Sequence, residues 1–160
     1  MTQESTTPVG AALAAQGVPH SEFVHEGPLR SLEQAAAERS QRPEQVVRSL
    51  LFRLAADQFV MVLVAGPQQV DWKALRRALG ESRLTTASRE EVRAVTGYEL
   101  GAVAPFANPQ PVRVLVDESV LAEEELSMGS GVRGTGIIIK RDDLLRALDE
   151  PEVISVSAQK

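Results

Sequence analysis

Apolar and polar residues follow two different periods along this chain, and the most distinct pattern is the unbroken apolar run Phe59 to Ala65. A strand without polar alternation is buried on both faces, so this run predicts the central strand of a sheet. The strand-like run Phe52 to Ala56 precedes it, and only Asp57 and Gln58 separate the two. Two such runs joined by a two-residue polar turn predict a hairpin.

Shorter runs predict further strands around this hairpin. The strongest is the β-branched run Val112 to Val116, which follows a proline and ends in two acidic residues. The acidic stretch Leu121 to Leu126 is ambiguous, and the tail Glu152 to Ser157 fits either an edge strand or a mobile end. The other runs with strand character are His20 to Glu26, Leu84 to Ala87 and Gly136 to Lys140.

Capping residues mark the starts and ends of helices. Ser31 with Gln34, and Ser88 with Glu91, form the capping box that begins a helix. Aspartate, or threonine before proline, also suits a helix start, and glycine past the last apolar position predicts a helix end. On these signals, helices are expected from Thr7 to Gly17, Ser31 to Arg39, Asp71 to Gly80, Ser88 to Gly97 and Asp142 to about Leu148.

A further helix is predicted to begin at Pro43, because proline suits the first helical turn and Glu44 complements the helix dipole. Apolar residues at helical spacing would form its buried face. These are Val46, Val47, Leu50 and Leu51. This assignment places Arg48 on a helix, near its buried side.

Helices and strands therefore intermix without the regular alternation of a doubly wound sheet. The expected fold is α+β, a single domain over residues 1–160 with a central mixed sheet surrounded by helices. A three-layer α/β arrangement is the alternative. Residues 1–16 would carry an N-terminal helix and residues 150–160 a tail. A chain of 160 residues is long enough to bury one substantial core.

Composition narrows the chemistry that such a domain can carry. Hydrophobic residues make up 43% and charged residues 24%, and the net charge of -5 argues against broad attraction to nucleic acid, although a local basic patch stays open. The sequence has no cysteine, which excludes disulfides, thiolate nucleophiles and cysteine metal ligands. No apolar run approaches the roughly 20 residues of a membrane span, and the N-terminus lacks the features of a secretory signal. A cytoplasmic protein is expected.

Two glycine-rich loops are candidate sites. The first follows the helix that ends at Gly97 and contains Gly101 and Pro105, and the second spans Gly129 to Gly134. Backbone N–H groups in such loops can hold a carbonyl, a carboxylate or a phosphate, although glycine also serves ordinary turns. The sequence alone leaves both readings open.

Side-chain chemistry is sparse. His20 and His25 lie in the same predicted strand at a spacing that faces them to opposite sides, so they would not share a metal. Each is expected to be a surface or strand-end histidine rather than a catalytic base. Arg48 cannot accept a proton, so it would either bind a carbonyl or phosphate, or reach solvent while its stem covers apolar surface. Spacing alone identifies no nucleophile, acid or base.

Three segments, taken in order, resemble the YbaK/ProX family, the editing-domain superfamily associated with prolyl-tRNA synthetase. They read Arg-Pro-Glu-Gln-Val-Val-Arg-Ser-Leu over 42–50, Tyr-Glu-Leu-Gly-Ala-Val-Ala-Pro-Phe over 98–106, and Gly-Ser-Gly-Val-Arg-Gly-Thr-Gly-Ile-Ile-Ile-Lys-Arg-Asp-Asp-Leu-Leu over 129–145. The resemblance covers roughly Gly17 to Leu148. It implies the editing-domain fold of this family and its activity, the hydrolysis of mischarged aminoacyl-tRNA in trans.

The resemblance also implies roles for individual residues. The glycine-x-x-x-proline loop of the family falls on Gly101 to Pro105, where backbone groups hold the aminoacyl ester. The pocket lysine of the family corresponds to Arg48, and the common serine of its second glycine-rich loop corresponds to Gly129. The expected catalytic residues are Gly101 and Arg48. The expected substrate-binding residues are Phe23, Val46, Leu50, Ala102, Pro105, Phe106, Gly129, Ser130 and Gly131.

Two functions follow from this resemblance. In the first, the protein is a freestanding deacylase whose loop backbone stabilises the oxyanion, while the ribose hydroxyl of the substrate assists the attacking water. In the alternative, it is a catalytically silent relative that binds tRNA, an aminoacyl-adenosine-like ligand or a synthetase. The implied partner is a mischarged tRNA, and a synthetase partner and the oligomeric state stay open. No metal or cofactor is expected.

Overall fold

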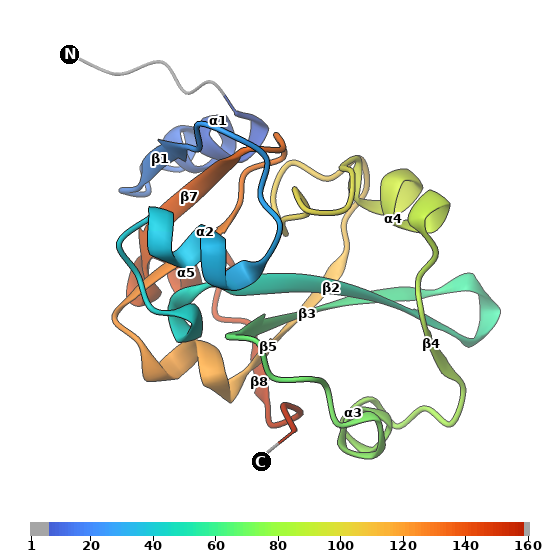
Figure 1. Ribbon diagram of the computed structural model, residues 1–160. Helices are drawn as coiled ribbons and strands as arrows, with labels where there is room; N and C mark the ends of the chain where they lie inside the picture. The colour runs from blue at the N-terminus through green and yellow to red at the C-terminus, as the bar shows by residue number, and fades with distance from the viewer. Residues whose placement is uncertain (1–6, 159–160) are drawn as a thin grey trace.

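The computed structural model describes residues 7–158, which form two sheets flanked by helices (Figure 1). The domain expected over residues 1–160 extends beyond this range at both ends. The helices are α1 (Pro8–Ala15), α2 (Leu32–Glu38), α3 (Trp72–Leu79), α4 (Arg89–Thr96) and α5 (Arg141–Ala147), with short 3-10 turns η1 (Pro43–Gln45), η2 (Ala55–Asp57) and η3 (Glu118–Ala122). The strands are β1 (Ser21–Val24), β2 (Val47–Leu54), β3 (Phe59–Ala65), β4 (Leu84–Thr86), β5 (Arg113–Asp117), β6 (Glu125–Gly129), β7 (Thr135–Lys140) and β8 (Glu152–Ile154).

The larger sheet is mixed and has the strand order β4-β2-β3-β5-β8. The pairs of β2 with β4 and β3 are antiparallel, and β5 pairs in parallel with β3 and β8. The smaller sheet, β1-β7-β6, is antiparallel. A parallel bridge between Val46 and Ser127 links the start of β2 to β6. The α+β fold with a mixed sheet is confirmed, and a second, smaller sheet accompanies it.

Strand β3 is the buried centre of the larger sheet, as its unbroken apolar run predicts. Val60, Val62 and Val64 point to a cluster that contains Leu75 of α3. The intervening residues of β3 point to the opposite cluster, which also receives α1, α4, α5 and the smaller sheet. Both faces of β3 are therefore covered, and the polar alternation of a half-exposed strand is not needed.

Most helix ends follow the predicted caps. The helices α1 to α4 are capped by Thr7, Ser31, Asp71 and Ser88. Gly80 and Gly97 end α3 and α4 in the left-handed region, with φ of 67° and 82°. The start of α5 differs, because this helix begins at Arg141 directly after β7. The cap expected at Asp142 is therefore wrong, and Asp142 lies in the first turn.

The helix predicted from Pro43 is also wrong, since only the short turn η1 forms there and Val47 already begins β2. Val46, Val47, Leu50 and Leu51 fit both a helical period and the alternation of a strand. Pairing with β3 from Val47 to Arg53 decides between them, because the hairpin is longer than its sequence suggested. Arg48 therefore lies on a strand.

The C-terminal segment forms β8 and is fastened to the larger sheet by one buried carboxylate. Asp117, the last residue of β5, accepts from the Val156 and Ser157 N–H groups at 2.7 and 3.1 Å and from the Ser119 N–H at 3.0 Å. Burial by itself raises the pKa of Asp117, but the hydrogen bonds from Ser119, Val156 and Ser157 lower it below the ordinary value. Of the two alternatives for the tail, the edge strand is confirmed.

Candidate functional site

The middle of β2 has an open edge that forms one wall of the candidate site. β4 covers β2 only at 52–54, and the bridge to β6 covers only its start. In an antiparallel ladder, the backbone groups of alternate residues point to opposite sides. The Ala87 N–H donates to the Leu51 carbonyl at 3.0 Å and so marks the side away from β3. By the same alternation, the N–H and C=O of Ser49 point to the open edge.

A cavity of about 380 Å³ lies against this edge. It is enclosed by β2, by the loop after α4, by the end of β6, and by α2 with the residues that precede it. Its wall is mainly apolar with few polar groups, which is typical of a site for a small ligand group. The lining residues are Leu29, Ser31, Leu32, Ala35, Arg39, Val46, Val47, Arg48, Ser49, Leu50, Leu100, Gly101, Val103, Met128 and Gly129.

The loop between α4 and β5 is held in place by buried hydrogen bonds. The Tyr98 hydroxyl donates to the Phe106 carbonyl at 2.6 Å, and the Asn108 amide donates to carbonyls of α4 and of the loop at 3.0 and 3.1 Å. Burial raises the pKa of Tyr98, so the phenol remains a donor at neutral pH. Gly101 has a φ of 93°, which favours glycine. The loop therefore presents a fixed backbone to the cavity.

Several backbone N–H groups of this loop form no hydrogen bond within residues 7–158, among them that of Leu100, which also lines the cavity. The Ala102 N–H donates to the Glu99 carbonyl at 3.0 Å. Within residues 7–158, the N–H groups of Gly101 and Val103 have no hydrogen-bond partner. Both residues line the cavity, so these two groups are candidate donors to a ligand.

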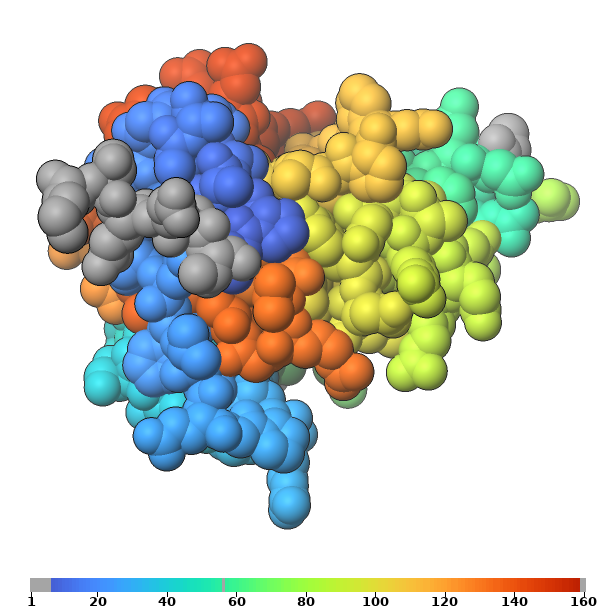
Figure 2. All heavy atoms as spheres, turned by 90° about the horizontal axis from the view of Figure 1, so that it is seen from above, coloured from blue at the N-terminus to red at the C-terminus, as the bar shows by residue number. Residues whose placement is uncertain are grey.

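The two glycine-rich loops touch, and the contact requires a glycine. A Cβ atom at Gly129 would lie 2.5 Å from the Val103 carbonyl oxygen and 3.0 Å from the Ala102 carbonyl carbon. The Gly131 N–H donates to the Ala102 carbonyl at 3.0 Å. Figure 2 shows the second loop, in orange, between α1 in blue and the first loop in yellow. The second loop thus braces the first.

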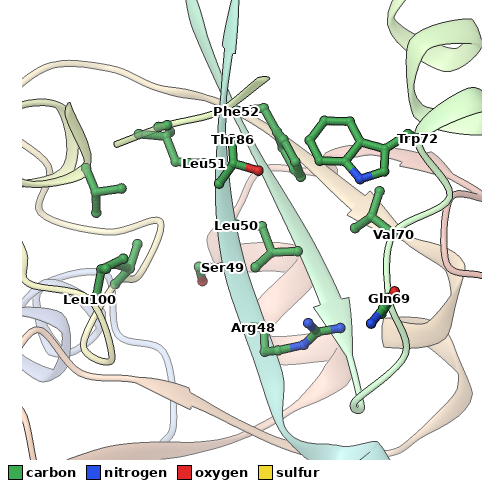
Figure 3. A pocket seen from close by; sticks show the side chains of 13 residues that line it. Arg48, Ser49, Leu50, Leu51, Phe52, Gln69, Val70, Trp72, Thr86 and Leu100 are labelled. Atoms are coloured by element: carbon green, nitrogen blue, oxygen red, sulfur yellow. The ribbon is translucent and has the colours of Figure 1, made fainter. Parts of the chain in front are cut away.

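Arg48 and Ser49 extend to opposite faces of β2 (Figure 3). The Arg48 Nε donates to the Gly66 carbonyl at 2.9 Å, and one of its Nη atoms donates to the Gln68 carbonyl. Burial lowers the pKa of Arg48. The guanidinium is therefore tied to the turn after β3.

Ser49 points the other way, towards Leu100 of the first loop (Figure 3). Its hydroxyl is buried and has no hydrogen-bond partner in the part of the chain that the structure describes. Such a group costs about 1–3 kcal/mol when it stays unsatisfied. With its own N–H and C=O at the open edge, Ser49 brings three polar groups to one point of an apolar wall.

A chain of polar side chains, all buried except Glu38, lies beside the cavity. Arg39 donates from Nε to Nε2 of His25 at 3.1 Å and from Nη1 to the Ser127 hydroxyl at 2.9 Å. His25 Nδ1 then donates to Glu38 at 2.7 Å, and this hydrogen bond lowers the pKa of Glu38. His25 lies just past the end of β1 as expected, but it is buried and not at the surface. Its neighbours explain the burial, because both ring nitrogens are satisfied.

The residues predicted for the site fall into two groups. Val46, Arg48, Leu50, Gly101 and Gly129 line the cavity. The others lie outside it, and these are Phe23, Ala102, Pro105, Phe106, Ser130 and Gly131.

Packing explains why the second group does not reach the wall. The Phe23 ring lies against His25, with 4.9 Å between ring centroids, and Phe106 is buried in the core. The Ser130 hydroxyl donates within its own loop, to the Thr135 carbonyl at 2.7 Å. Phe23 and Phe106 therefore do not line this cavity, and their roles in substrate binding stay predictions.

Sequence reasoning missed Ser49 and Arg39. Ser49 could have been found from the strand register, because it is the hydroxyl residue between two inward-facing apolar residues, Val47 and Leu51. Arg39 carries no such signal, since its contacts are with residues distant in the sequence.

Between residues 7 and 158, no group of three or more histidine, cysteine, aspartate or glutamate side chains could hold a metal ion. None of the helices in this range is long and apolar enough to cross a membrane.

An α+β domain with a mixed sheet, a small cavity at an open strand edge and free loop donors beside that cavity is suited to hold a small group by its backbone. The model of the family described as aminoacyl-tRNA editing domain matches residues 26–147. This range is more than half of the chain. The protein belongs to the aminoacyl-tRNA editing domain family, as the resemblance predicted.

Individual relatives agree with this membership. The chain is 30% identical over 124 residues to a proline–tRNA ligase of Kosmotoga olearia. The aligned region covers 76% of this chain and 21% of the ligase. It is 29% identical over 100 residues to the multifunctional Ser/Thr-tRNA deacylase ProXp-y of Escherichia coli, covering 62% of this chain and 59% of that protein. A crystal structure of a candidate trans-editing enzyme for prolyl-tRNA synthetase has a TM-score of 0.87 and 26% identity, over 98% of this chain and 100% of the other. The chain spans about a fifth of the ligases that it matches.

Proposed function

We propose that this protein is a freestanding aminoacyl-tRNA deacylase that hydrolyses the ester of a mischarged tRNA. Its family and its similarity to a Ser/Thr-tRNA deacylase support the reaction class. The cavity wall carries the proposal: of the described residues that line it, none has a carboxylate, imidazole or thiol. Such a site lacks a general base of its own, but it can position an ester by backbone groups.

The proposed mechanism rests on positioning. The N–H groups of Gly101 and Val103 donate to the ester carbonyl and stabilise the negative charge that forms when water adds to the carbonyl carbon. The neighbouring ribose hydroxyl of the substrate orients the water and relays its proton to the leaving ribose oxygen. The bond between the carbonyl carbon and that oxygen then breaks, which releases the amino acid and a tRNA with both ribose hydroxyls free.

Ser49 joins this mechanism as a substrate-binding residue. Its free hydroxyl and its backbone groups lie across the cavity from Leu100 and the glycine loop. They suit the α-ammonium group or the ester of the substrate, because the surrounding wall offers few competing polar groups. Arg48 lies on the same strand, but two of its N–H donors already bind the carbonyls of Gly66 and Gln68.

Selection among amino acids would be steric. Val46, Leu50 and Met128 contribute apolar surface to the wall, so a bulky side chain would be excluded while a small one is accepted. An apolar wall discriminates by only about 1–3 kcal/mol per methylene, so close homologues of the preferred amino acid would also react.

The predicted residues outside the cavity would act through the loops that they support. They are Phe23, Ala102, Pro105, Phe106, Ser130 and Gly131.

Purified protein and a panel of tRNAs, each charged with a matched or mismatched amino acid, test the proposal. We expect deacylation of at least one mischarged tRNA carrying a small amino acid, at a rate that grows with enzyme concentration. Loss of this activity in a Gly101→Val variant that circular dichroism shows to be folded would exclude a contaminating hydrolase. Rates equal to buffer alone for every tRNA at high enzyme concentration would refute the deacylase.

The second candidate is a catalytically silent relative that binds tRNA, an aminoacyl-adenosine-like ligand or a synthetase. It is favoured by one observation, the two carbonyls that hold Arg48 away from the glycine loop. Arg48→Lys separates the candidates: activity that appears only in this variant indicates a silent binder. Activity of the native protein that falls in Arg48→Ala indicates that arginine is used. We also propose that the protein acts in the cytoplasm and that residues 1–160 form one editing domain.

A further inference from the structure

A second cavity, of about 300 Å³, adjoins the first at β2, and its lining residues come from both faces of this strand (Figure 3). The segment between β3 and α3 forms its outer wall. The residues shared by the two cavities are Arg48, Ser49, Leu50, Leu100 and Val103. Two groups that are covalently linked in one substrate can therefore bind in the two cavities at the same time.

On the side of β2 that faces α3, two aromatic side chains line this second cavity. Phe52 of β2 and Trp72 of α3 meet edge to face, with ring centroids 5.4 Å apart and an interplanar angle of 89°. Phe52 is 3% exposed, whereas Trp72 remains 36% exposed beside the cavity. Leu50 and Val70 complete the apolar surface (Figure 3). An indole with this much free surface offers a flat ring for stacking.

The outer wall is fixed before any ligand arrives. The Asp71 N–H donates to the Val156 carbonyl at 2.7 Å, and the Ala158 N–H donates to the Gln69 carbonyl at 2.6 Å. The Asp71 side chain also caps α3, of which Trp72 is the first residue. The exposed Gln69 side chain lies at the end of the cavity opposite Trp72 (Figure 3). The pocket thus combines a stacking surface with an amide at its polar end.

We propose that the α3 side of this cavity, formed by Leu50, Phe52, Gln69, Val70 and Trp72, binds the adenine ring of the 3′-terminal adenosine of tRNA. The proposal rests on the proposed function, because it assigns the nucleoside attached to the ester in the first cavity. Unpaired bases at RNA ends are bound by aromatic stacking. A glutamine amide can pair with N6 and N7 of adenine. The base stacks on Trp72, and Gln69 reads its edge.

The geometry favours adenine over two other occupants. A phosphate would need a free cation, but two Arg48 donors already bind the carbonyls of Gly66 and Gln68. A small amino acid side chain would leave the Trp72 ring largely uncovered, whereas a purine covers it. The amino acid therefore belongs in the first cavity, next to the glycine loop.

Intrinsic fluorescence tests the adenine site without any need for turnover, because Trp72 is the only tryptophan in the sequence. The protein is titrated with AMP, CMP and UMP, which carry the same phosphate. We expect saturable quenching by AMP at concentrations at least about 5-fold lower than for CMP or UMP. No quenching, or equal quenching by the three nucleotides, would overturn the assignment. Gln69→Ala should reduce the preference for AMP, and an unchanged preference would remove Gln69 from the site.

Deacylation kinetics provide the second test. Trp72→Ala should lower kcat/KM for the preferred mischarged tRNA about 5- to 100-fold, and Trp72→Phe should restore most of the loss by keeping a stacking ring. Leu121→Ala on η3 is the matched control, since Leu121 is 37% exposed and lies outside both cavities. Circular dichroism checks that each variant is folded.

The outcomes keep the two proposals apart. AMP quenching without deacylation supports the adenine site and refutes the deacylase. Deacylation without AMP quenching, and with unchanged kcat/KM in a folded Trp72→Ala variant, refutes the adenine site and leaves the deacylase standing.

Discussion

The Ser49 hydroxyl lowers the stability of the free protein and has a proposed role in substrate binding. Its hydroxyl is buried at the wall of the cavity without a partner in the described chain, whereas the Ser127 hydroxyl, equally buried, accepts from Arg39 at 2.9 Å. A polar group left unsatisfied in the free protein lowers stability and gains its partner only when a ligand binds. These two serines therefore form a matched pair for mutation.

We expect Ser49→Ala to raise the free energy of unfolding by up to about 1 kcal/mol, because it removes an unsatisfied hydroxyl. The same variant should lower kcat/KM for deacylation about 10-fold, since one hydrogen bond to the substrate is lost. Ser127→Ala should instead destabilise the protein. Denaturant unfolding and single-turnover deacylation measure the two effects. A Ser49→Ala variant with lower stability and full activity would contradict the assignment.

Gly129 tests the contact between the two glycine-rich loops. A side chain there meets backbone at 2.5 Å, which cannot move aside as a flexible side chain can. We expect Gly129→Ser, although it introduces the residue common in the family, to destabilise the fold by about 1–3 kcal/mol and to lower activity by displacing Val103. Gly27→Ala, with open space around its Cβ position, is the control and should be neutral. Thermal unfolding that is equal for both variants would contradict the close contact.

At the scale of elements, most local signals in the sequence predict the structure correctly, whereas contacts between distant segments do not follow from it. The caps at Ser88 and Asp71 act within one turn of helix, so the sequence alone located α3 and α4. The segment 46–51 fits two periods, and only its pairing with β3 selects the strand. The glycine loop, Arg48 and Leu50, to which the resemblance assigns roles, line the cavity, and those roles stay predictions. The distances of Phe23 and Phe106 from it depend on tertiary packing that no local pattern encodes.

The junction of β5 with the C-terminal strand predicts an acid-sensitive element. Because the folded pKa of Asp117 is below the ordinary value of 3.8, its ionised form contributes stability in full above pH 3.8. That contribution is lost as the pH falls through the folded pKa. We expect Asp117→Asn to cost on the order of 2 kcal/mol at neutral pH, and the difference from the native protein to shrink in acid.

Denaturant unfolding at neutral and acidic pH measures this difference. Glu118→Gln is the control, because Glu118 is the neighbouring carboxylate but is exposed and bonds only the Ser155 hydroxyl at 2.9 Å among the described residues. It should change stability little at either pH. A penalty for Asp117→Asn that stays constant with pH would show that the charge of Asp117 contributes nothing.

At the scale of the whole molecule, the first cavity lies where the two sheets meet. β2 belongs to the larger sheet and the end of β6 to the smaller one, and both line the cavity near the bridge from Val46 to Ser127. A ligand in this cavity touches both sheets at once. Its binding free energy is therefore available only while the two sheets stay together.

We expect a non-hydrolysable aminoacyl-adenosine amide to slow hydrogen exchange in β6 and β7 as well as in β2. Exchange that requires the sheets to separate must first release the ligand. Amides of β8, at the far edge of the larger sheet, should exchange at an unchanged rate. Hydrogen-deuterium exchange read by mass spectrometry measures all of these strands, and protection confined to β2 and the glycine loop would contradict the coupling.

The meeting of the sheets at this cavity has a consequence for the lifetime of the protein in a cell. At a ligand concentration 100 times Kd, binding adds about 2.7 kcal/mol to the stability of the native state. Here that increment acts on the junction whose opening would expose β2 and β6 to proteases. Degradation should therefore slow when mischarged tRNA accumulates, so that the substrate itself preserves the protein that removes it.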